Sequence, residues 1–134
     1  MVLVSPGRVR EEVERTDSLL RAAGQRGPIW FRPPYSYKFV VLPRYLASTG
    51  RTTVMWSIEP DSHEEVAETP EGIVRHVLDR VRPGSIIILH PWYASRRTSR
   101  EALGPLVDSL HARGYRVETV RTLLDAASSP QEGH

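Results

Sequence analysis

Apolar side chains recur every three or four residues over several stretches of the chain, which is the spacing typical of amphipathic helices. The first such stretch covers residues 8–23. It follows a Ser5-Pro6 start signal and stops before Gly24, so the pattern predicts one helix with defined ends. Further helices are expected over residues 39–48, 69–81, 98–114 and 122–127.

Local signals mark the starts of two of these helices. Thr69 directly precedes Pro70, so the threonine is the expected N-cap and the proline the expected first helical residue. Either Thr98 or Ser99 is expected to cap the next long helix, because both carry a hydroxyl that can accept a hydrogen bond from a backbone N–H.

Short apolar runs lie between the predicted helices. The run over residues 85–89 is almost continuously apolar, as in a parallel strand covered on both faces. Other strands are expected over residues 28–34, 52–58 and 115–120, the first of them closing on two prolines. One helix followed by four rounds of strand and helix specifies a parallel sheet with helical crossovers. The predicted fold class is therefore α/β.

Composition narrows the classes of function. The chain has 134 residues, 40% hydrophobic and 25% charged, as expected of one globular unit. No apolar run approaches the roughly 20 residues that a membrane-spanning helix needs, so a membrane partner is not expected. The absence of cysteine excludes disulfides and thiolate metal sites. Residues 1–10 lack the apolar core of a signal peptide, so nothing in this sequence indicates export.

The charge pattern argues against a nucleic acid partner. The net charge is only +2, and the one basic cluster, Arg96, Arg97 and Arg100, has no aromatic residues nearby beyond Trp92 and Tyr93. We interpret the cluster as a solvated loop.

Unusual polar and aromatic residues follow three of the predicted strands. In parallel sheets chemistry gathers beyond the carboxyl ends of the strands, so these residues are candidates for a common site. The three clusters are Arg32-Pro-Pro-Tyr35, Glu59-Pro-Asp61-Ser-His63 and His90-Pro-Trp92.

With these motifs the chain resembles the NodB-homology polysaccharide deacetylases, carbohydrate esterase family 4, over roughly residues 5–125. Phe31-Arg32-Pro-Pro-Tyr35-Ser36 fits the Arg-x-Pro-aromatic motif of the family, and Ile86-Ile-Ile-Leu-His90 fits its leucine-x-histidine motif with Ile88 in the leucine place. The resemblance implies a partial (β/α) barrel of about four parallel strands with flanking helices. We assign residues 1–127 to the C-terminal half of such a domain and expect residues 128–134 to form a disordered tail.

The resemblance also implies an activity, the removal of N- or O-acetyl groups from an acetylated polysaccharide with the help of a divalent metal, zinc or cobalt. His90 would be the general acid that protonates the leaving amine. A neighbouring carboxylate, either Glu59 or Asp61, would raise its basicity. In the gap-free alignment Glu59 takes the place of the first aspartate of the Asp-x-x-Asp-Trp motif, and Asp61 fits only after a slip of one residue.

The remaining site residues follow from the same resemblance. Arg32 would orient the catalytic base through its guanidinium group. The backbone N–H of Tyr35 would help to bind the oxyanion. Ile88 and Trp92 would line the pocket for the acetyl methyl group, and Trp92 could instead stack on a sugar.

Two motifs of the family do not occur in this sequence. They are the Thr-Phe-Asp-Asp-Gly segment with the base and one metal ligand, and the His-x-x-x-His segment with two more ligands. We therefore expect that Met1 is internal to a longer deacetylase, that the metal ligands lie outside this chain, and that the isolated chain is inactive. Exposed sheet edges predict self-association or complementation by the missing half.

Two other functions are left open. The chain could be a non-catalytic remnant that binds carbohydrate or a partner protein through the same strand ends, or an α/β scaffold that oligomerises by sheet completion. Family members commonly act on extracellular or cell-envelope glycans, yet the chain has no signal peptide, so its localisation is open. The polysaccharide itself is also open among chitin oligosaccharides, peptidoglycan and acetylxylan.

Overall fold

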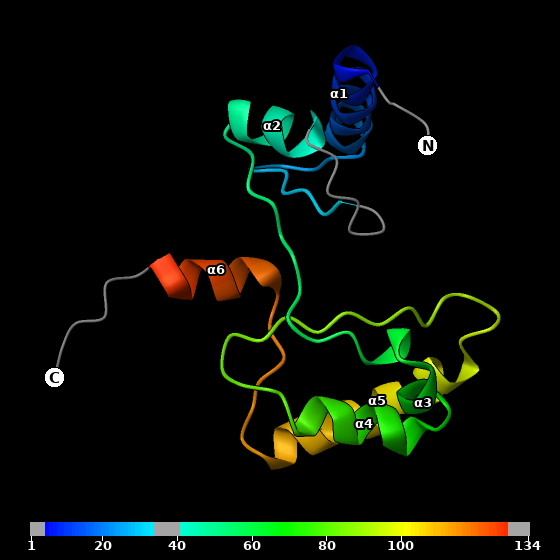
Figure 1. Cartoon of the computed structure of the whole chain (residues 1–134). Helices are drawn as coiled ribbons and strands as arrows, with labels where there is room; N and C mark the ends of the chain where they lie inside the picture. Colours follow the sequence, from blue (N-terminus) through cyan, green and yellow to red (C-terminus); the bar gives the residue numbers. More distant parts are fainter. Residues whose placement is uncertain (1–4, 34–40, 129–134) are drawn as a thin grey trace, which may run out of the picture. The chain divides into compact units, whose positions relative to one another are not determined.

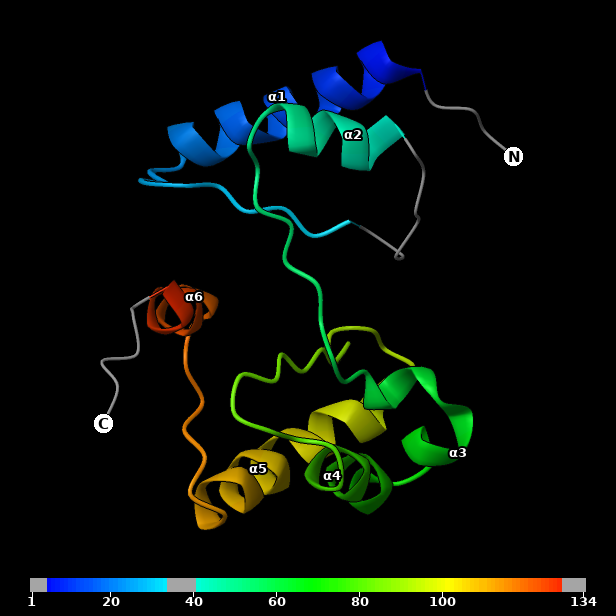
Figure 2. The same ribbon diagram turned by 60° about the vertical axis from the view of Figure 1, so that its left-hand side comes forward.

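The computed structural model describes residues 5–33 and 41–128, and the chain divides into two compact units, Met1–Met55 and Trp56–His134. The helices of the first unit are α1 (Pro6–Ala22) and α2 (Val41–Ser48), which lie side by side in both views (Figures 1 and 2). The helices of the second unit are η2 (Pro60–Ser62), α3 (Glu64–Ala67), α4 (Pro70–Leu78), α5 (Arg97–Ala112) and α6 (Val120–Ser128).

The first predicted helix is confirmed with a slightly earlier start. The Ser5 side chain accepts a hydrogen bond from the backbone N–H of Arg8, and Pro6 occupies the first helical position. The helix ends at Ala22, and Gly24 follows with a φ of 95°, a conformation that glycine adopts without a steric penalty.

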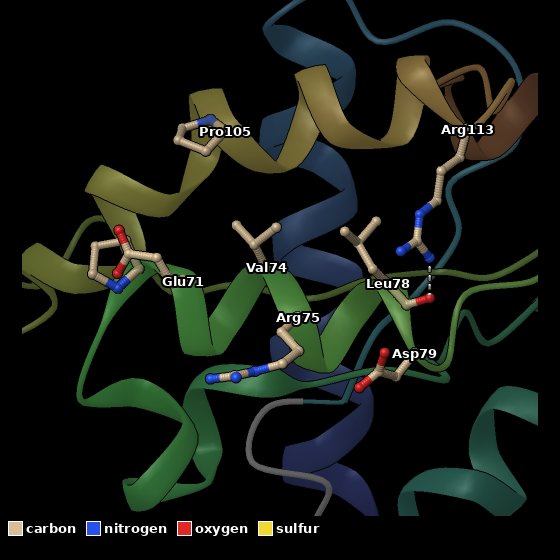
Figure 3. Close-up of a pocket in the computed structure, with 8 residues that line it drawn as sticks. Glu71, Val74, Arg75, Leu78, Asp79, Pro105 and Arg113 are labelled. Carbon is tan, nitrogen blue, oxygen red and sulfur yellow. Dashed lines mark hydrogen bonds between the residues drawn. The ribbon is translucent and has the colours of Figure 1, made fainter.

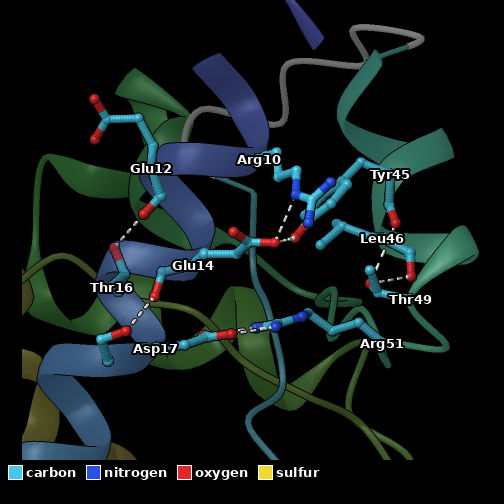
Figure 4. Close-up of polar contacts among 10 residues, drawn as sticks. Arg10, Glu12, Glu14, Thr16, Asp17, Tyr45, Leu46, Thr49 and Arg51 are labelled. Carbon is cyan, nitrogen blue, oxygen red and sulfur yellow. Dashed lines mark hydrogen bonds and ion pairs between the residues drawn. The ribbon is translucent and has the colours of Figure 1, made fainter. Parts of the chain in front are cut away.

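Buried apolar and polar contacts join α1 to α2 and to the segment after it. Leu46 of α2 and Val13 of α1 are buried. The guanidinium group of Arg51 donates two hydrogen bonds to the carboxylate of Asp17, one of them at 2.8 Å (Figure 4). Although partial burial opposes it, the hydrogen bond from Arg51 lowers the pKa of Asp17. This ion pair therefore fixes the exit of α2 against α1.

Two extended segments of the first unit run parallel to each other. The Phe31 N–H donates to the Thr52 carbonyl at 3.0 Å, and the Val54 N–H donates to the Phe31 carbonyl at 2.8 Å. Arg32 donates from Nε to the Val54 carbonyl at 3.2 Å. The segments form an isolated bridge between Phe31 and Thr53.

In the second unit the predicted start of α4 is confirmed and that of α5 is wrong. The Thr69 hydroxyl accepts from the Gly72 N–H at 3.0 Å, and Pro70 opens α4. The N-cap of α5 is Arg96 rather than Thr98 or Ser99. Ser99 does not cap because its hydroxyl donates instead to the carboxylate of Asp61.

The core of the second unit lies between α4, α5 and the extended segments beside them. Ile58, Val77, Leu106 and Leu110 form the buried cluster, and partly buried residues such as Ile87 pack against it. Val77 comes from α4, and Leu106 and Leu110 from α5, so each helix contributes one apolar face. The described residues contain no helix long and apolar enough to cross a membrane.

The expectation of about four parallel strands is not confirmed in the described residues. They form two isolated parallel bridges, Phe31 with Thr53 and Ile58 with Ile87. At the second, the Ser57 N–H donates to the Ile86 carbonyl at 2.9 Å and the Ile88 N–H donates to the Ile58 carbonyl at 2.9 Å. The parallel direction agrees with the prediction, but each bridge is isolated and no strand is formed among the described residues.

Other element bounds also differ from the prediction. The helix expected to reach residue 81 ends at Leu78, and the last helix begins at Val120, inside the stretch expected to be a strand. The predicted tail lies outside the described residues except for Ser128, which is the last residue of α6.

Replacement of Arg51 by alanine is expected to lower the free energy of unfolding by about 1–2 kcal/mol, because a partly buried Asp17 loses both of its charged hydrogen bonds. Urea unfolding followed by circular dichroism measures the change. Arg15→Ala, at an exposed position of α1, is the matched control and should stay within about 0.5 kcal/mol of the wild type. Equal effects of the two substitutions would show that the ion pair adds nothing.

Candidate functional site

The centre of the site is the carboxylate of Asp61, which is almost entirely withdrawn from water. Asp61 lies in the short helix η2, which begins at Pro60, two residues after the extended Ile58. Only 1% of its surface is exposed. A buried carboxylate is costly unless hydrogen-bond donors surround it, so its partners define the geometry of the site.

Asp61 accepts hydrogen bonds from two residues distant in sequence. Its Oδ2 atom accepts from the backbone N–H of His90 at 2.7 Å and from the hydroxyl of Ser99 at 2.9 Å. Its Oδ1 atom lies 3.0 Å from Nδ1 of the His90 ring. In addition, Arg96 donates from its guanidinium group to the Asp61 carbonyl oxygen. The residue therefore joins η2 to the loop after residue 89 and to the start of α5.

Electrostatics keep this carboxylate ionised. Burial raises the pKa of Asp61, but the hydrogen bonds from the His90 backbone and ring and from Ser99 outweigh burial, and the net pKa is lowered. An ionised carboxylate can only accept, so Nδ1 of His90 carries the hydrogen that it shares with Oδ1. In the neutral form of the ring the lone pair is then on Nε2, and a third of the side chain is exposed. The arrangement suits proton exchange at Nε2.

Of the two candidate carboxylates, the structure places Asp61 beside His90. Glu59 is occupied elsewhere, since its Oε2 atom accepts a hydrogen bond from Nε1 of Trp56 at 2.8 Å. The aspartate that required a slip of one residue in the alignment is therefore the one that contacts the histidine.

The loop after His90 carries two exposed aromatic side chains, Trp92 at 91% and Tyr93 at 59% exposure. The Tyr93 ring stacks near the His90 ring, with 6.4 Å between centroids and 27° between planes. Arg100 on α5 fastens this loop by donating to the Pro91 carbonyl at 2.9 Å and to the Tyr93 carbonyl at 2.8 Å. Arg100 thus restrains the backbone of the loop, while the side chains of Trp92 and Tyr93 are exposed to solvent.

The other predicted site residues are placed as follows. Ile88 is half-buried in the extended segment that leads to His90. Arg32 belongs to the first unit, where its Nε atom donates to the Val54 carbonyl. Tyr35 lies outside the described residues. The roles of these three residues stay predictions.

Sequence reasoning missed three of the residues that hold the site. Ser99 was expected to cap a helix, and Arg96 and Arg100 were interpreted as part of a solvated loop. Arg97 does fit that interpretation, with an exposed side chain 3.5 Å from Glu101. Two arginines that follow a candidate site histidine at short range could have been interpreted as loop anchors, because a guanidinium group can donate to several carbonyls at once.

A separate hollow of about 240 Å³ is lined by residues of α4, of α5 and of the ends of these helices (Figure 3). Val74, Leu78 and Pro105 form its apolar floor, and Arg113 at its end donates to the Leu78 carbonyl at 2.7 Å. Its lining contains neither Asp61 nor His90. We therefore do not assign the chemistry to it.

The residues that the structure describes do not fit a metal. Among them no group of three or more histidine, aspartate, glutamate or cysteine side chains could hold an ion. His63 and His76 come within 5.2 Å of each other by ring centroid, but they form only a pair.

Comparison with known proteins identifies the class. No protein-family model matches the chain. It is 33% identical over 97 residues to a peptidoglycan-N-acetylglucosamine deacetylase of Bacillus cereus, covering 72% of this chain and 46% of the relative. It is 31% identical over 99 residues to a chitooligosaccharide deacetylase of Azorhizobium caulinodans, covering 66% and 46%.

A similar solved structure belongs to the same class. It is a mutant with restored enzymatic activity of a family 4 carbohydrate esterase pseudoenzyme, whose wild type is from Bacillus anthracis. The TM-score is 0.75 at 25% identity, over 93% of this chain and 44% of the other. The chain therefore belongs to the NodB-homology polysaccharide deacetylases of carbohydrate esterase family 4, whose fold is a (β/α) barrel. It spans about half the length of the curated relatives it matches.

Substitution of Asp61 by asparagine is expected to lower the free energy of unfolding by about 2–4 kcal/mol, because an amide cannot accept from all three donors that surround it. Urea unfolding measures the loss. Asp108→Asn, at an exposed position of α5, is the matched control and should change stability little.

The stability of the wild type and that of Asp61→Asn should depend differently on pH. Because the pKa of Asp61 is lower in the folded chain, the unfolded chain binds more protons just below pH 4, and the stability due to this group falls as pH falls. The stability difference between wild type and Asp61→Asn should therefore be full above about pH 5 and shrink toward pH 2. A difference independent of pH would contradict the ionised carboxylate.

Proposed function

We propose that this chain supplies the proton-donating part of a polysaccharide deacetylase site, with His90 as the general acid and Asp61 as its partner. The observation that carries the proposal is the buried Asp61 carboxylate held against both the backbone and the ring of His90. The pair lies beside an exposed, fastened loop in a chain of the deacetylase family.

The chemistry needs such an acid. When an acetamide is hydrolysed, its carbon–nitrogen bond breaks, water supplies the new oxygen of acetate, and the nitrogen leaves as an amine only after it takes up a proton. The imidazolium form of His90, protonated at Nε2 by solvent, would give that proton to the nitrogen and return to the neutral ring, and the negative charge of Asp61 would stabilise the imidazolium before the transfer. In the hydrolysis of an O-acetyl ester, the leaving oxygen of the sugar would take up a proton in the same way.

The substrate would be an acetylated polysaccharide, such as peptidoglycan or chitooligosaccharides, on which relatives act by name. Ile88 and Trp92 would contact the acetyl group or the sugar, and the backbone of Tyr35 would bind the oxyanion. Arg32 would orient the catalytic base. The exposure of Trp92 supports its role, because an indole ring presented to solvent can stack on the apolar face of a sugar.

The metal and the base are proposed to come from residues outside this sequence. Deacetylases of the family are generally metal-dependent, yet the Asp-Asp-Gly and His-x-x-x-His motifs are absent from these 134 residues and the described side chains hold no suitable group. Alone, the chain would be inactive. A segment that carries the two motifs would complete the site, or the chain would associate with itself through the edges of its extended segments.

A second candidate is a non-catalytic protein that binds an acetylated glycan through the same loop. The similarity to a family 4 pseudoenzyme favours it. In that case Trp92 would matter for binding, whereas the ionisation of Asp61 and His90 would not.

Calorimetric titration of the chain with zinc or cobalt at neutral pH is expected to show no stoichiometric binding with sub-micromolar affinity. A stable site needs about three protein ligands, and the described residues contain no group of three. His90→Ala is the matched variant. Tight binding that disappears in His90→Ala would show a metal site within this chain and would contradict the proposed division of the active site.

Acetate release from acetylated chitooligosaccharides with cobalt tests the activity. The chain alone should release none, and the chain mixed with a polypeptide carrying the two motifs of a relative should release acetate. His90→Ala should lower that rate about 10²–10⁴-fold, the usual contribution of general acid catalysis. His111→Ala, at an exposed position of α5, is the control and should leave the rate unchanged. Sugar binding without release in every mixture would favour the non-catalytic protein.

A further inference from the structure

Ser99 is a buried polar residue whose hydroxyl donates to the site carboxylate. It lies in the first turn of α5 with 1% of its surface exposed. Its hydroxyl donates to Oδ2 of Asp61 at 2.9 Å across 38 positions of sequence. None of the sequence motifs at the site includes this serine, so we infer its role from its contacts in the structure.

Each oxygen of Asp61 has a donor from His90, and the Ser99 hydroxyl gives Oδ2 a second one. Oδ2 accepts from Ser99 and from the His90 backbone N–H, whereas Oδ1 faces Nδ1 of the His90 ring. The terminal torsion of an aspartate side chain is broad, and without Ser99 both donors to the carboxylate would belong to His90 itself, so the carboxylate could turn together with that residue. The Ser99 hydroxyl ties Oδ2 to α5, independently of His90, and so holds the carboxylate plane with Oδ1 directed at the ring.

The backbone of Asp61 is also held from α5. Arg96, the N-cap residue of that helix, donates to the Asp61 carbonyl oxygen. The start of α5 therefore holds Asp61 at both its main chain and its side chain. This double attachment makes the position of the carboxylate a property of α5 as well as of η2.

We propose that Ser99 is a positioning residue: through Asp61 it keeps the His90 ring in the Nδ1–H form and leaves Nε2 to exchange a proton with a ligand. The catalytic meaning of this inference rests on the function proposed above, while the geometry does not. A purely structural serine would join α5 to η2 and affect stability alone. Only the positioning role predicts that the loss of the Ser99 hydroxyl changes the tautomer of the His90 ring.

Long-range ¹H–¹⁵N spectra of the histidine rings distinguish the roles, because the two neutral tautomers have different nitrogen shifts. Spectra of the whole chain are taken at a pH where the ring signals no longer move. In Ser99→Ala the ratio of the Nδ1–H to the Nε2–H form of His90 should fall roughly three- to tenfold, the worth of one hydrogen bond. Ser99→Thr, which keeps the hydroxyl, should restore the ratio.

Ser109→Ala is the matched control, since this serine lies in the last turn of the same helix, whereas Ser99 lies in the first. It should leave the His90 signals unchanged. Unchanged His90 signals in folded Ser99→Ala, even with lower stability, would overturn the inference. If Ser99→Ala does not fold, Ser99→Cys keeps the side-chain size with a weaker donor. An intermediate ratio in Ser99→Cys is then expected, and the wild-type ratio would overturn the inference.

The outcome is separable from that of the proposed function. The spectra need neither metal nor substrate, so a tautomer shift in Ser99→Ala together with no acetate release in any mixture would support the positioning role and reject the deacetylase. Acetate release that depends on His90, without a tautomer shift in Ser99→Ala, would reject the positioning role and support the deacetylase.

Discussion

A carboxylate withdrawn from water must be surrounded by donors, and in this chain that requirement organises the second unit around Asp61. The donors to the carboxylate come from a histidine at the end of an extended segment and from a serine in the first turn of α5, and an arginine that precedes that helix donates to the main-chain carbonyl of Asp61. None of these partners is near Asp61 in sequence. Ile58 and residues of α4 and α5 form the apolar cluster, and the carboxylate of Asp61 joins η2 to the loop at His90 and to the start of α5.

How much of this arrangement could be foreseen depends on how local each signal is. The starts of α1 and α4 are set by a hydroxyl and a proline that act within one turn, so the sequence predicts them correctly. The start of α5 was misplaced because the Ser99 hydroxyl serves a residue 38 positions away. Nothing in a local pattern shows that a serine is engaged at long range. The same limit applies to Arg96 and Arg100, because they donate to backbone carbonyls, and every residue has a backbone carbonyl whatever its side chain.

The choice between Glu59 and Asp61 shows a different limit. A motif read without gaps favours Glu59, and only the turn at Pro60 determines which carboxylate faces His90. The parallel direction of the apolar runs was foreseen, since such runs with helical crossovers can be arranged in few ways. The shortness of their pairing, two isolated bridges in the described residues, was not foreseen, because the hydrogen bonds of a strand depend on neighbouring segments that its own residues do not specify.

The fastening of the loop after His90 has a consequence for how a ligand would meet it. An exposed tryptophan on a mobile loop gives up conformational entropy when it stacks on a partner, which weakens the complex. Here Arg100 has already restricted the backbone on both sides of Trp92 through the carbonyls of Pro91 and Tyr93. The loop is preorganised, so less of the contact energy is lost to ordering it. An arginine that never touches the ligand would in this way slow its dissociation.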